Sequence, residues 1–417
     1  MSNALSNHVA ELYREHYREV LAPLVRLTGS FERAEEAAQE SFVVALQHWA
    51  VRGVPDEPVP WLRRVARNRA IDVARRGARW ADKVDALKRE ATLGSAGRQN
   101  SEPDPERIED DLLRLVFTCC HPALPARDRI ALTLHTVCGL TSDEVARSLL
   151  VSRATLQQRL LRAKRKIAVA GIPYVVPTTR DMPARLQSVL QTFYLVFTEG
   201  YSSTNSERLV RDELCNEAIR LVRLLRRVLP GRSEVDGLLA LMLMHHARSD
   251  ARTDSGGRLV RLADQDRATW DHDAIAEARP LVESSLRARP LSRYAVEAAI
   301  AALHNGAERA PDTDWAQIVQ LYDVLLERGW GGPIVELNRA VALAFSGSIE
   351  AGLRELDLLD ASGALAGNHL LPVARAELLG RLGRREDALA ALESARELVV
   401  NPVERTFLDE RIRDAAC

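Results

Sequence analysis

The sequence predicts an all-α protein, with two small helical domains joined by a linker and followed by a long helical array. Aromatic residues make up only 5% of the 417 residues, while Ala, Leu, Arg and Glu, which favour helices over sheets, are abundant. Apolar residues recur at helical spacing along most of the chain, and polar segments rich in Gly and Pro separate these stretches. A chain of this length suits roughly two to four units, each with its own core.

Composition and charge restrict the class of protein. No apolar stretch approaches the roughly 20 residues that span a bilayer, and the N-terminal residues lack the apolar core of a secretion signal. Five cysteines, an odd and sparse set, do not suggest a disulfide framework. We therefore expect a cytoplasmic protein without membrane contact, with free thiols and no cofactor. The formal net charge of -1 combines segments of opposite charge, and the basic residues cluster early in the chain.

The first predicted domain spans residues 8–77 and contains two amphipathic helices. Residues 31–49 predict a helix with one acidic and one apolar face, which by itself would be a routine solvated helix. Residues 60–76 predict a strongly basic helix. Its apolar stripe consists of Leu62, Val65, Ala66, Ala70 and Val73. Its opposite face carries Arg63, Arg64, Arg67 and Arg75, with Asp72 as the only acid, and such a face favours a polyanion.

Two further side chains of the basic helix suit bases in a separated single strand. Asn68 adds a hydrogen-bonding amide, and Trp61 adds an aromatic surface on which a base can stack. Taken alone, however, Trp61 is more typical of a core residue. The basic face therefore predicts a nucleic-acid contact, with the role of Trp61 left open.

A polar linker leads to a second helical domain. Residues 78–105 lose the helical periodicity and contain Gly, Ser and Pro, which suits a flexible connection. Helices resume in the second domain, residues 106–170. There, Thr141 and Glu144 predict a capping box for a short helix, and Ser152 can cap the helix after it. The buried face of the short helix is expected to consist of Val145, Ala146 and Leu149.

The helix that follows Ser152 is basic and ends in Lys164-Arg165-Lys166. Its buried residues are expected to be Leu156, Leu160 and Leu161. Its exposed residues are expected to be Arg153, Thr155, Gln157, Gln158, Arg159 and Arg162. Two short helices, a tight turn and a basic second helix predict a DNA-reading helix-turn-helix, in which first-turn side chains reach base edges and later ones pair with phosphates. The alternative is an ordinary αα-hairpin with a solvated basic face.

Residues 183–417 are predicted to form a helical extension that contains a repeat. Aligning residues 339–343 with 375–379 places Gly347 over Gly383 and Glu350 over Glu386. The same alignment places Leu353 and Leu356 over Leu389 and Leu392. The offset is close to tetratricopeptide length, and such hairpins must stack on neighbours to bury their apolar faces. An unrelated pair of amphipathic hairpins is the alternative, because Ala- and Leu-rich helices resemble one another by composition.

Two clusters of potential ligands suggest other interpretations. Cys119-Cys120 followed by His121 suggests a metal or redox site, but neighbouring cysteines on a helix point about 100° apart, and small buried core residues are the simpler interpretation. The segment 244–250 and the acids from Asp254 to Asp273 could supply metal ligands or paired carboxylates. The sequence lacks a phosphate loop, a nucleophile elbow and a His-Glu-x-x-His spacing, so we expect neither a metal site nor an enzyme.

The acidic helix, the basic helix, the linker and the helix-turn-helix, in that order, resemble the two conserved domains of the extracytoplasmic-function (ECF) sigma factors. The resemblance covers roughly the first 170 residues and implies an alternative sigma factor that binds core RNA polymerase and directs promoter-specific transcription initiation. The remainder resembles a subgroup whose tetratricopeptide-like extension controls activity. Segments typical of that subgroup are residues 117–124, Glu199-Gly200-Tyr201 and Asp264-Gln265-Asp266-Arg267.

The resemblance also implies a role for each matched residue. Contacts to core polymerase fall on Glu35, Glu36, Gln39, Glu40 and Phe42. Contacts to the promoter minus-ten element fall on Trp61, Arg64, Arg67, Asn68, Asp72, Arg75 and Arg76. Contacts to the minus-thirty-five element fall on Ser152, Arg153, Thr155, Gln157, Gln158, Arg159, Arg162, Lys164 and Arg165. Ala34 departs from the family pattern, which commonly has an Asp before the acidic pair.

The implied partners are core RNA polymerase and promoter DNA, and the extension leaves a protein or a small molecule as a further partner. The main alternative is a DNA-binding or scaffolding regulator that uses the helix-turn-helix without engaging polymerase. A simple repressor needs neither the acidic helix nor the segment from Asn68 to Asp72. The presence of both segments favours the sigma factor.

Overall fold

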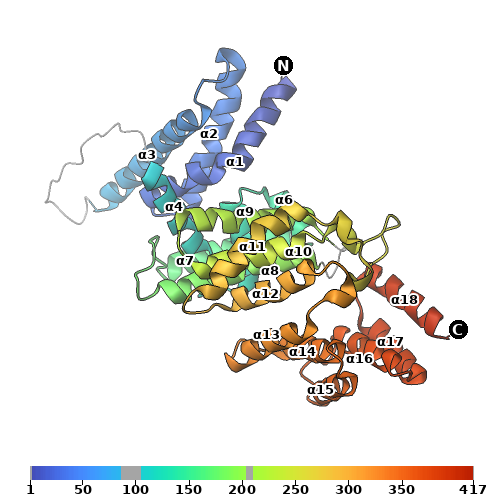
Figure 1. Ribbon diagram of the computed structural model, residues 1–417. Helices are drawn as coiled ribbons and strands as arrows, with labels where there is room; N and C mark the ends of the chain where they lie inside the picture. The colour runs from blue at the N-terminus through green and yellow to red at the C-terminus, as the bar shows by residue number, and fades with distance from the viewer. Residues whose placement is uncertain (1, 86–104, 203–209, 417) are drawn as a thin grey trace. The chain divides into compact units, whose positions relative to one another are not determined.

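The secondary structure of the described residues is helical. The computed structural model describes the backbone at residues 2–85, 105–202 and 210–416, and the side chains at residues 5–72, 110–202 and 210–415. These residues form 18 α-helices, one π-helical turn and four short 3-10 turns, with no strand among them (Figure 1). This confirms the predicted all-α fold class. The chain divides into two compact units, Met1–Phe193 and Tyr194–Cys417.

The first unit opens with three helices, α1 (Ser2–Thr28), α2 (Phe31–Arg52) and α3 (Pro58–Asp85). Ser30 starts α2 by accepting a hydrogen bond from the Arg33 N–H, and Gly53 ends it with a φ of 79°, a conformation that favours glycine. Leu62, Ala66 and Ala70 of α3 are buried, as the predicted apolar stripe requires. Helix α3 continues beyond residue 77, the predicted end of the first domain. Residues 86–104, most of the predicted linker, lie outside the described residues.

The same unit continues with α4 (Pro105–Cys119), α5 (Ala126–Leu132), a π-helical turn (Thr133–Val137), α6 (Ser142–Ser148) and α7 (Arg153–Val169). Helix α8 (Met182–Tyr201) begins in this unit and ends in the next. Ser188 Oγ donates to the Cys120 carbonyl at 2.6 Å, and Arg185 Nη2 donates to the Phe117 carbonyl at 2.7 Å. The first half of α8 is therefore held against α4 and the turn after it.

A bundle of four helices forms the first part of the second unit: α9 (Asp212–Val228), α10 (Ser233–His246), α11 (His272–Arg287) and α12 (Arg293–Gly306). Helix α10 is buried along most of its length and packs against the other three. A helix with apolar residues on every side suits such a central position. Gly237 lets α10 approach α12 closely, because a Cβ at this position would lie 2.8 Å from the Ala295 nitrogen.

The remaining helices are α13 (Trp315–Glu327), α14 (Pro333–Phe345), α15 (Ile349–Ala361), α16 (Leu370–Arg381), α17 (Arg385–Leu398) and α18 (Pro402–Ala416). The two predicted repeat units are the hairpins α14–α15 and α16–α17. Gly347 and Gly383 lie in their turns with φ of 110° and 75°, so both turns favour glycine. Of the four aligned leucines, three are buried and Leu389 is half-buried.

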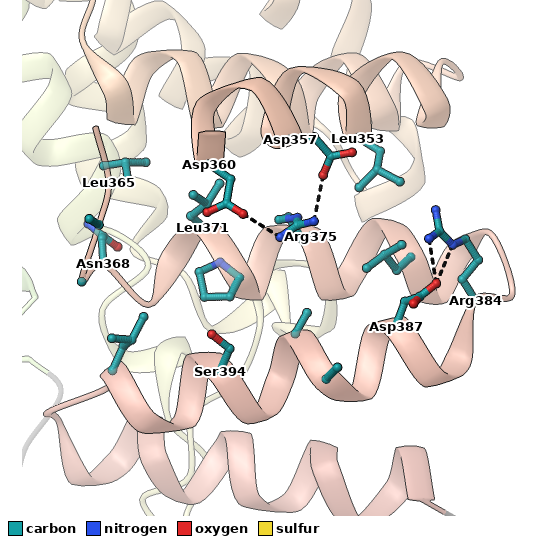
Figure 2. A pocket seen from close by; sticks show the side chains of 17 residues that line it. Leu353, Asp357, Asp360, Leu365, Asn368, Leu371, Arg375, Arg384, Asp387 and Ser394 are labelled. Carbon is teal, nitrogen blue, oxygen red and sulfur yellow. Dashed lines mark hydrogen bonds and ion pairs between the residues drawn. The ribbon is translucent and has the colours of Figure 1, made fainter. Parts of the chain in front are cut away.

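A groove of about 380 Å³ lies between α15, α16 and α17 (Figure 2). Arg375 of α16 reaches across to α15, where it pairs with Asp357 at 2.9 Å and Asp360 at 2.8 Å. Arg384 at the start of α17 pairs with Asp387 at 2.7 Å. Each arginine in this groove therefore has a carboxylate partner.

Candidate nucleic-acid interface

The predicted helix-turn-helix is present in α6 and α7. Glu144 N–H donates to Thr141 Oγ1 at 3.2 Å, and Thr141 N–H donates to Glu144 Oε2 at 2.8 Å, which is the predicted capping box. Leu150 takes a φ of 50° in the turn. Ser152 Oγ then accepts from the Thr155 N–H at 3.1 Å and caps α7. Two short capped helices around a tight turn have the geometry of a DNA-reading unit.

The outward face of α7 is polar and basic. Its exposed residues include Ser152, Arg153, Thr155, Gln157, Gln158, Arg162 and Arg165. Arg159 and Lys164 are half-buried. Leu156 and Leu160 are buried as predicted, but the prediction that Leu161 is buried is wrong, because this side chain is 53% exposed. One residue turns a helix by about 100°, so the residue after Leu160 moves from the packed face to the solvent face.

Two ion pairs orient arginines of α7. Arg153 Nη1 lies 3.4 Å from Asp143 Oδ1 on α6, and Arg162 Nη2 lies 3.1 Å from Asp128 Oδ1 on α5. The Arg162 side chain nevertheless stays 64% exposed, while its partner Asp128 is buried. The buried carboxylate therefore fixes the direction of Arg162 and leaves its guanidinium open to a phosphate.

Helix α3 presents part of the predicted basic face. Arg64, Arg67, Asn68 and Asp72 are exposed. Arg63, also expected on that face, is instead half-buried and pairs with Glu19 of α1 at 2.6 Å. The side chains of Arg75 and Arg76 lie outside the described residues.

The Trp61 ring packs against two aromatic residues of α2. Its ring centroid is 5.2 Å from that of Trp49 and 5.5 Å from that of His48, both on α2. The residue is half-buried.

The five residues matched to polymerase contacts divide between the surface and the core of α2. Glu36 and Gln39 are exposed, and Glu40 is half-buried and pairs with Arg69 at 3.3 Å. Glu35 and Phe42 are 8% and 5% exposed and lie in the core.

Sequence reasoning missed two apolar side chains on the outer side of α2. Val43 is 51% exposed and Leu46 is 38% exposed. Their spacing from Glu36 and Gln39 places all four on one helical face. The same spacing in the sequence could have identified this mixed acidic and apolar face.

Within the first unit α1 packs against α4, and ion pairs join α1 to α6 and α2 to α7. Lys164 Nζ of α7 pairs with Glu35 Oε2 of α2, with both side chains largely withdrawn from water. Arg26 of α1 pairs with the buried Asp111 of α4 at 2.9 Å, and the Tyr174 hydroxyl donates to the Ala22 carbonyl at 2.9 Å. Helix α2, which carries the acidic face, thus contacts α7 of the helix-turn-helix.

Comparison with known proteins identifies the two halves of this unit. The family model for Sigma-70 region 2 matches residues 12–80, and that for Sigma-70 region 4 matches residues 114–167. The ECF RNA polymerase sigma factor SigL of Mycobacterium tuberculosis is 30% identical over 37% of this chain and 84% of SigL. The chain belongs to the ECF family of RNA polymerase sigma factors.

Other relatives extend this assignment. SigM, an ECF RNA polymerase sigma factor of Bacillus subtilis, is 28% identical over 38% of this chain and 92% of SigM. An uncharacterized protein of Rhizobium meliloti (strain 1021) is 41% identical over 94% of this ECF sigma factor and 92% of that protein, so the extension is shared between them. Residues 185–286 match a family of unknown function, DUF6596. No solved structure gives a significant match.

The chain is thus an alternative sigma factor that directs transcription initiation, with a long helical extension. Membership of the family implies core RNA polymerase and promoter DNA as partners. A sigma factor is a transcription regulator rather than a catalyst.

The cysteine cluster of this sigma factor is buried. Burial raises the pKa of Cys120 to about 11 and raises the pKa of Cys119 well above its ordinary value. In the part of the chain that the structure describes, no group of three or more His, Cys, Asp or Glu residues could hold a metal ion. None of the described helices is long and apolar enough to cross a membrane.

Proposed function

We propose that this sigma factor reads the minus-thirty-five element with α7, contacts the minus-ten element with α3 and docks on core RNA polymerase with the outer face of α2. The proposal rests above all on α7, a capped helix whose polar and basic face is exposed along its length. A factor that joins core RNA polymerase to a promoter requires separate surfaces for the polymerase, the minus-ten element and the minus-thirty-five element.

On α7, Arg153, Thr155 and Gln157 occupy the first turns, where a recognition helix meets base edges. Arg and Gln suit guanine and adenine, because each can form two hydrogen bonds with the major-groove edge of its base. Arg162 and Arg165 lie farther along and suit phosphates.

Substitutions on α7 test this division of roles. Arg162→Ala should weaken minus-thirty-five binding on all sequences and lower the salt slope by about one phosphate contact, whereas Gln157→Ala should relax sequence preference. Arg33→Ala, which removes an exposed charge on α2, is the matched control and should leave DNA binding unchanged. An unchanged affinity and salt slope for Arg162→Ala would contradict the phosphate assignment.

On α3, Arg64, Arg67 and Asn68 suit the opened minus-ten strand, because a basic surface with an amide and a stacking platform binds single strands. The half-buried Trp61 would supply that stacking surface. Asp72, Arg75 and Arg76 follow on the same helix and remain predicted contacts.

On α2, polymerase docking is assigned to Glu36, Gln39, Val43 and Leu46. Exposed apolar residues flanked by polar ones are typical of protein contacts. Of the other matched residues, Glu40 is half-buried and paired with Arg69, while Glu35 and Phe42 would act from the core by shaping this helix.

Promoter binding requires the first unit to open. Lys164, a predicted minus-thirty-five contact, is paired with Glu35 and its side chain is only 14% exposed, so a phosphate has little access to it. We infer that separating α2 from α7 accompanies binding of polymerase and promoter.

The helical extension is proposed to regulate this step. A chain that ends after Gly332 lacks α14–α18 and keeps the residues of α8 that pack against α4. A changed level of promoter-dependent transcription would support regulation, and an unchanged level would indicate a passive scaffold.

Run-off transcription with purified core RNA polymerase on the promoter region of its own gene tests the main proposal. A specific transcript that requires the protein is expected, and it should be lost when Val43 and Leu46 are both replaced by Asp. Arg287→Gln, which removes an exposed charge that pairs with Glu283 on α11, serves as the control. Failure of the wild-type chain to bind core polymerase would instead favour a DNA-binding scaffold.

A further inference from the structure

A second pocket, of about 340 Å³, lies in the second unit, where the ends of α8 and α10 meet the irregular segment 248–265. The residues that line it are Tyr201, His245, Arg248, Arg252, Leu259, Val260, Arg261, Leu262 and Gln265. Three of these residues are arginines and none is acidic. The pocket thus differs from the groove of Figure 2, where aspartates balance the arginines.

Among the described residues, only one of the three arginines pairs with carboxylates. Arg261 pairs with Asp264 at 2.6 Å and with Glu377 at 3.5 Å. Among the described residues, by contrast, no carboxylate lies within ion-pair distance of Arg248 or Arg252. Arg248 is only 5% exposed, so its charge has little access to water. Two neighbouring guanidinium groups without an anion are a costly arrangement in a protein interior.

Neutral groups hold these arginines in place. Arg248 Nη2 donates to His245 Nδ1 at 2.8 Å, which requires an unprotonated acceptor nitrogen. Burial, together with the charges of Arg248 and Arg252, lowers the pKa of His245 well below its ordinary value and keeps the ring neutral. Arg252 donates to the Tyr201 carbonyl, and its guanidinium lies 4.1 Å from the centroid of the Tyr201 ring.

Hydrogen-bonding capacity remains unused at the pocket. Arg248 Nε and Gln265 Oε1 are buried atoms without a hydrogen-bond partner among the described residues. Arg267, on a neighbouring turn, shows how an arginine with a purely structural role is satisfied, because its Nη1 donates to the carbonyls of His304 at 2.6 Å and Ala307 at 2.8 Å. A buried donor left open next to a cavity can bond an acceptor atom of a ligand or a water.

We propose that this pocket binds a small molecule that carries an oxyanion, either a carboxylate or a phosphate group. The fork of a guanidinium matches both groups through paired, charge-assisted hydrogen bonds. The anion would lie between Arg248 and Arg252, and Gln265 Oε1 would accept a hydrogen bond from a donor group of the ligand. Leu259, Val260 and Leu262 give the pocket an apolar side, and its volume suits a compact metabolite.

Titration calorimetry on the full-length protein tests the site, with inorganic phosphate and benzoate as probes at constant ionic strength in chloride buffer. We expect saturable binding of at least one probe with one site per chain. Stronger binding of phosphate would assign a phosphate-bearing ligand, and stronger binding of benzoate would assign an apolar carboxylate. The assay contains neither polymerase nor DNA, so a negative result would not bear on the proposed function in transcription.

Variants separate the pocket from general charge effects. Arg252→Gln should weaken binding by about tenfold or more, because it removes charge-assisted hydrogen bonds. Arg248→Lys keeps the buried charge but loses the fork of the guanidinium, and it should also weaken binding. This second variant keeps the test open if Arg252→Gln does not fold. Arg287→Gln removes an exposed charge that pairs with Glu283 on α11 and should bind as the wild type does. The proposal would be overturned if neither probe showed saturable binding up to about 10 mM, or if both pocket variants bound with wild-type affinity.

Discussion

Replacing Lys164 with Met should loosen the packing of α7 against α2. Lys164 Nζ pairs with Glu35 Oε2, and the exposed fractions of the two side chains are 14% and 10%. The other carboxylate oxygen, Glu35 Oε1, is buried and has no hydrogen-bond partner among the described residues. Lys164 is therefore the main compensation for this buried charge. Removing one partner of such a pair costs about 3–5 kcal/mol.

A cost of this size should shift the equilibrium for local opening by roughly a hundredfold or more. Hydrogen exchange of the amides in α2 and α7, measured in the full-length protein, reports this equilibrium directly. Arg14→Met is the matched control. Arg14 pairs with Glu144 and so joins α1 to α6, but its side chain is 64% exposed. An exposed pair contributes about 1 kcal/mol or less, so exchange should change little.

The double variant Glu35→Gln with Lys164→Met removes both charges and should recover most of the protection lost in Lys164→Met. Two results would refute the reasoning. One is exchange in Lys164→Met no faster than in Arg14→Met. The other is a double variant that opens as readily as Lys164→Met alone, which would mean that the buried charge of Glu35 is not the cause.

Three further predictions concern stability. Gly352→Ala should destabilise the α14–α15 hairpin by about 1–3 kcal/mol in thermal unfolding, because the new Cβ would lie 2.5 Å from the Ala340 carbonyl oxygen. A Cβ at Gly380 meets open space, so Gly380→Ala should be neutral or stabilising in the same assay. Ser152→Ala removes the cap of α7 and should lower the free energy of unfolding by about 1 kcal/mol, and an unchanged midpoint in urea would contradict this role. Burial and the charges of Arg248 and Arg267 lower the pKa of His304 from 6.5 to about 4. The unfolded chain therefore takes up this proton at a higher pH than the folded chain does. The stability that neutral His304 contributes above pH 6.5 is thus lost as the pH falls toward 4. His304→Gln should flatten that pH dependence, and equal slopes for both proteins would contradict the assignment.

Local signals account for the parts of the site that the sequence predicts well. The caps at Thr141 and Ser152 involve side chains that bond backbone groups three residues away, so the start of each helix is encoded locally. Helical periodicity likewise predicts the burial of Leu156 and Leu160. The repeat of α14–α15 in α16–α17 follows from the same periodicity and from the turn glycines.

Long-range contacts account for the parts that the sequence does not predict. Glu35 resembles a solvated acidic residue, but Lys164, its partner, is 129 residues away. Arg63 belongs by pattern to a basic face, but Glu19 on another helix binds it. The anion pocket likewise combines Tyr201 with residues between 245 and 265, which no single motif links.

The sequence by itself determined the all-α class, the helix-turn-helix and the membership of the sigma family, because these depend on periodicity, caps and short motifs. Only the tertiary structure decided which charged side chains face solvent and which are paired or left without a counter-charge. The physical reason is that the cost of burying a charge depends on groups from distant segments, and folding alone brings those segments together.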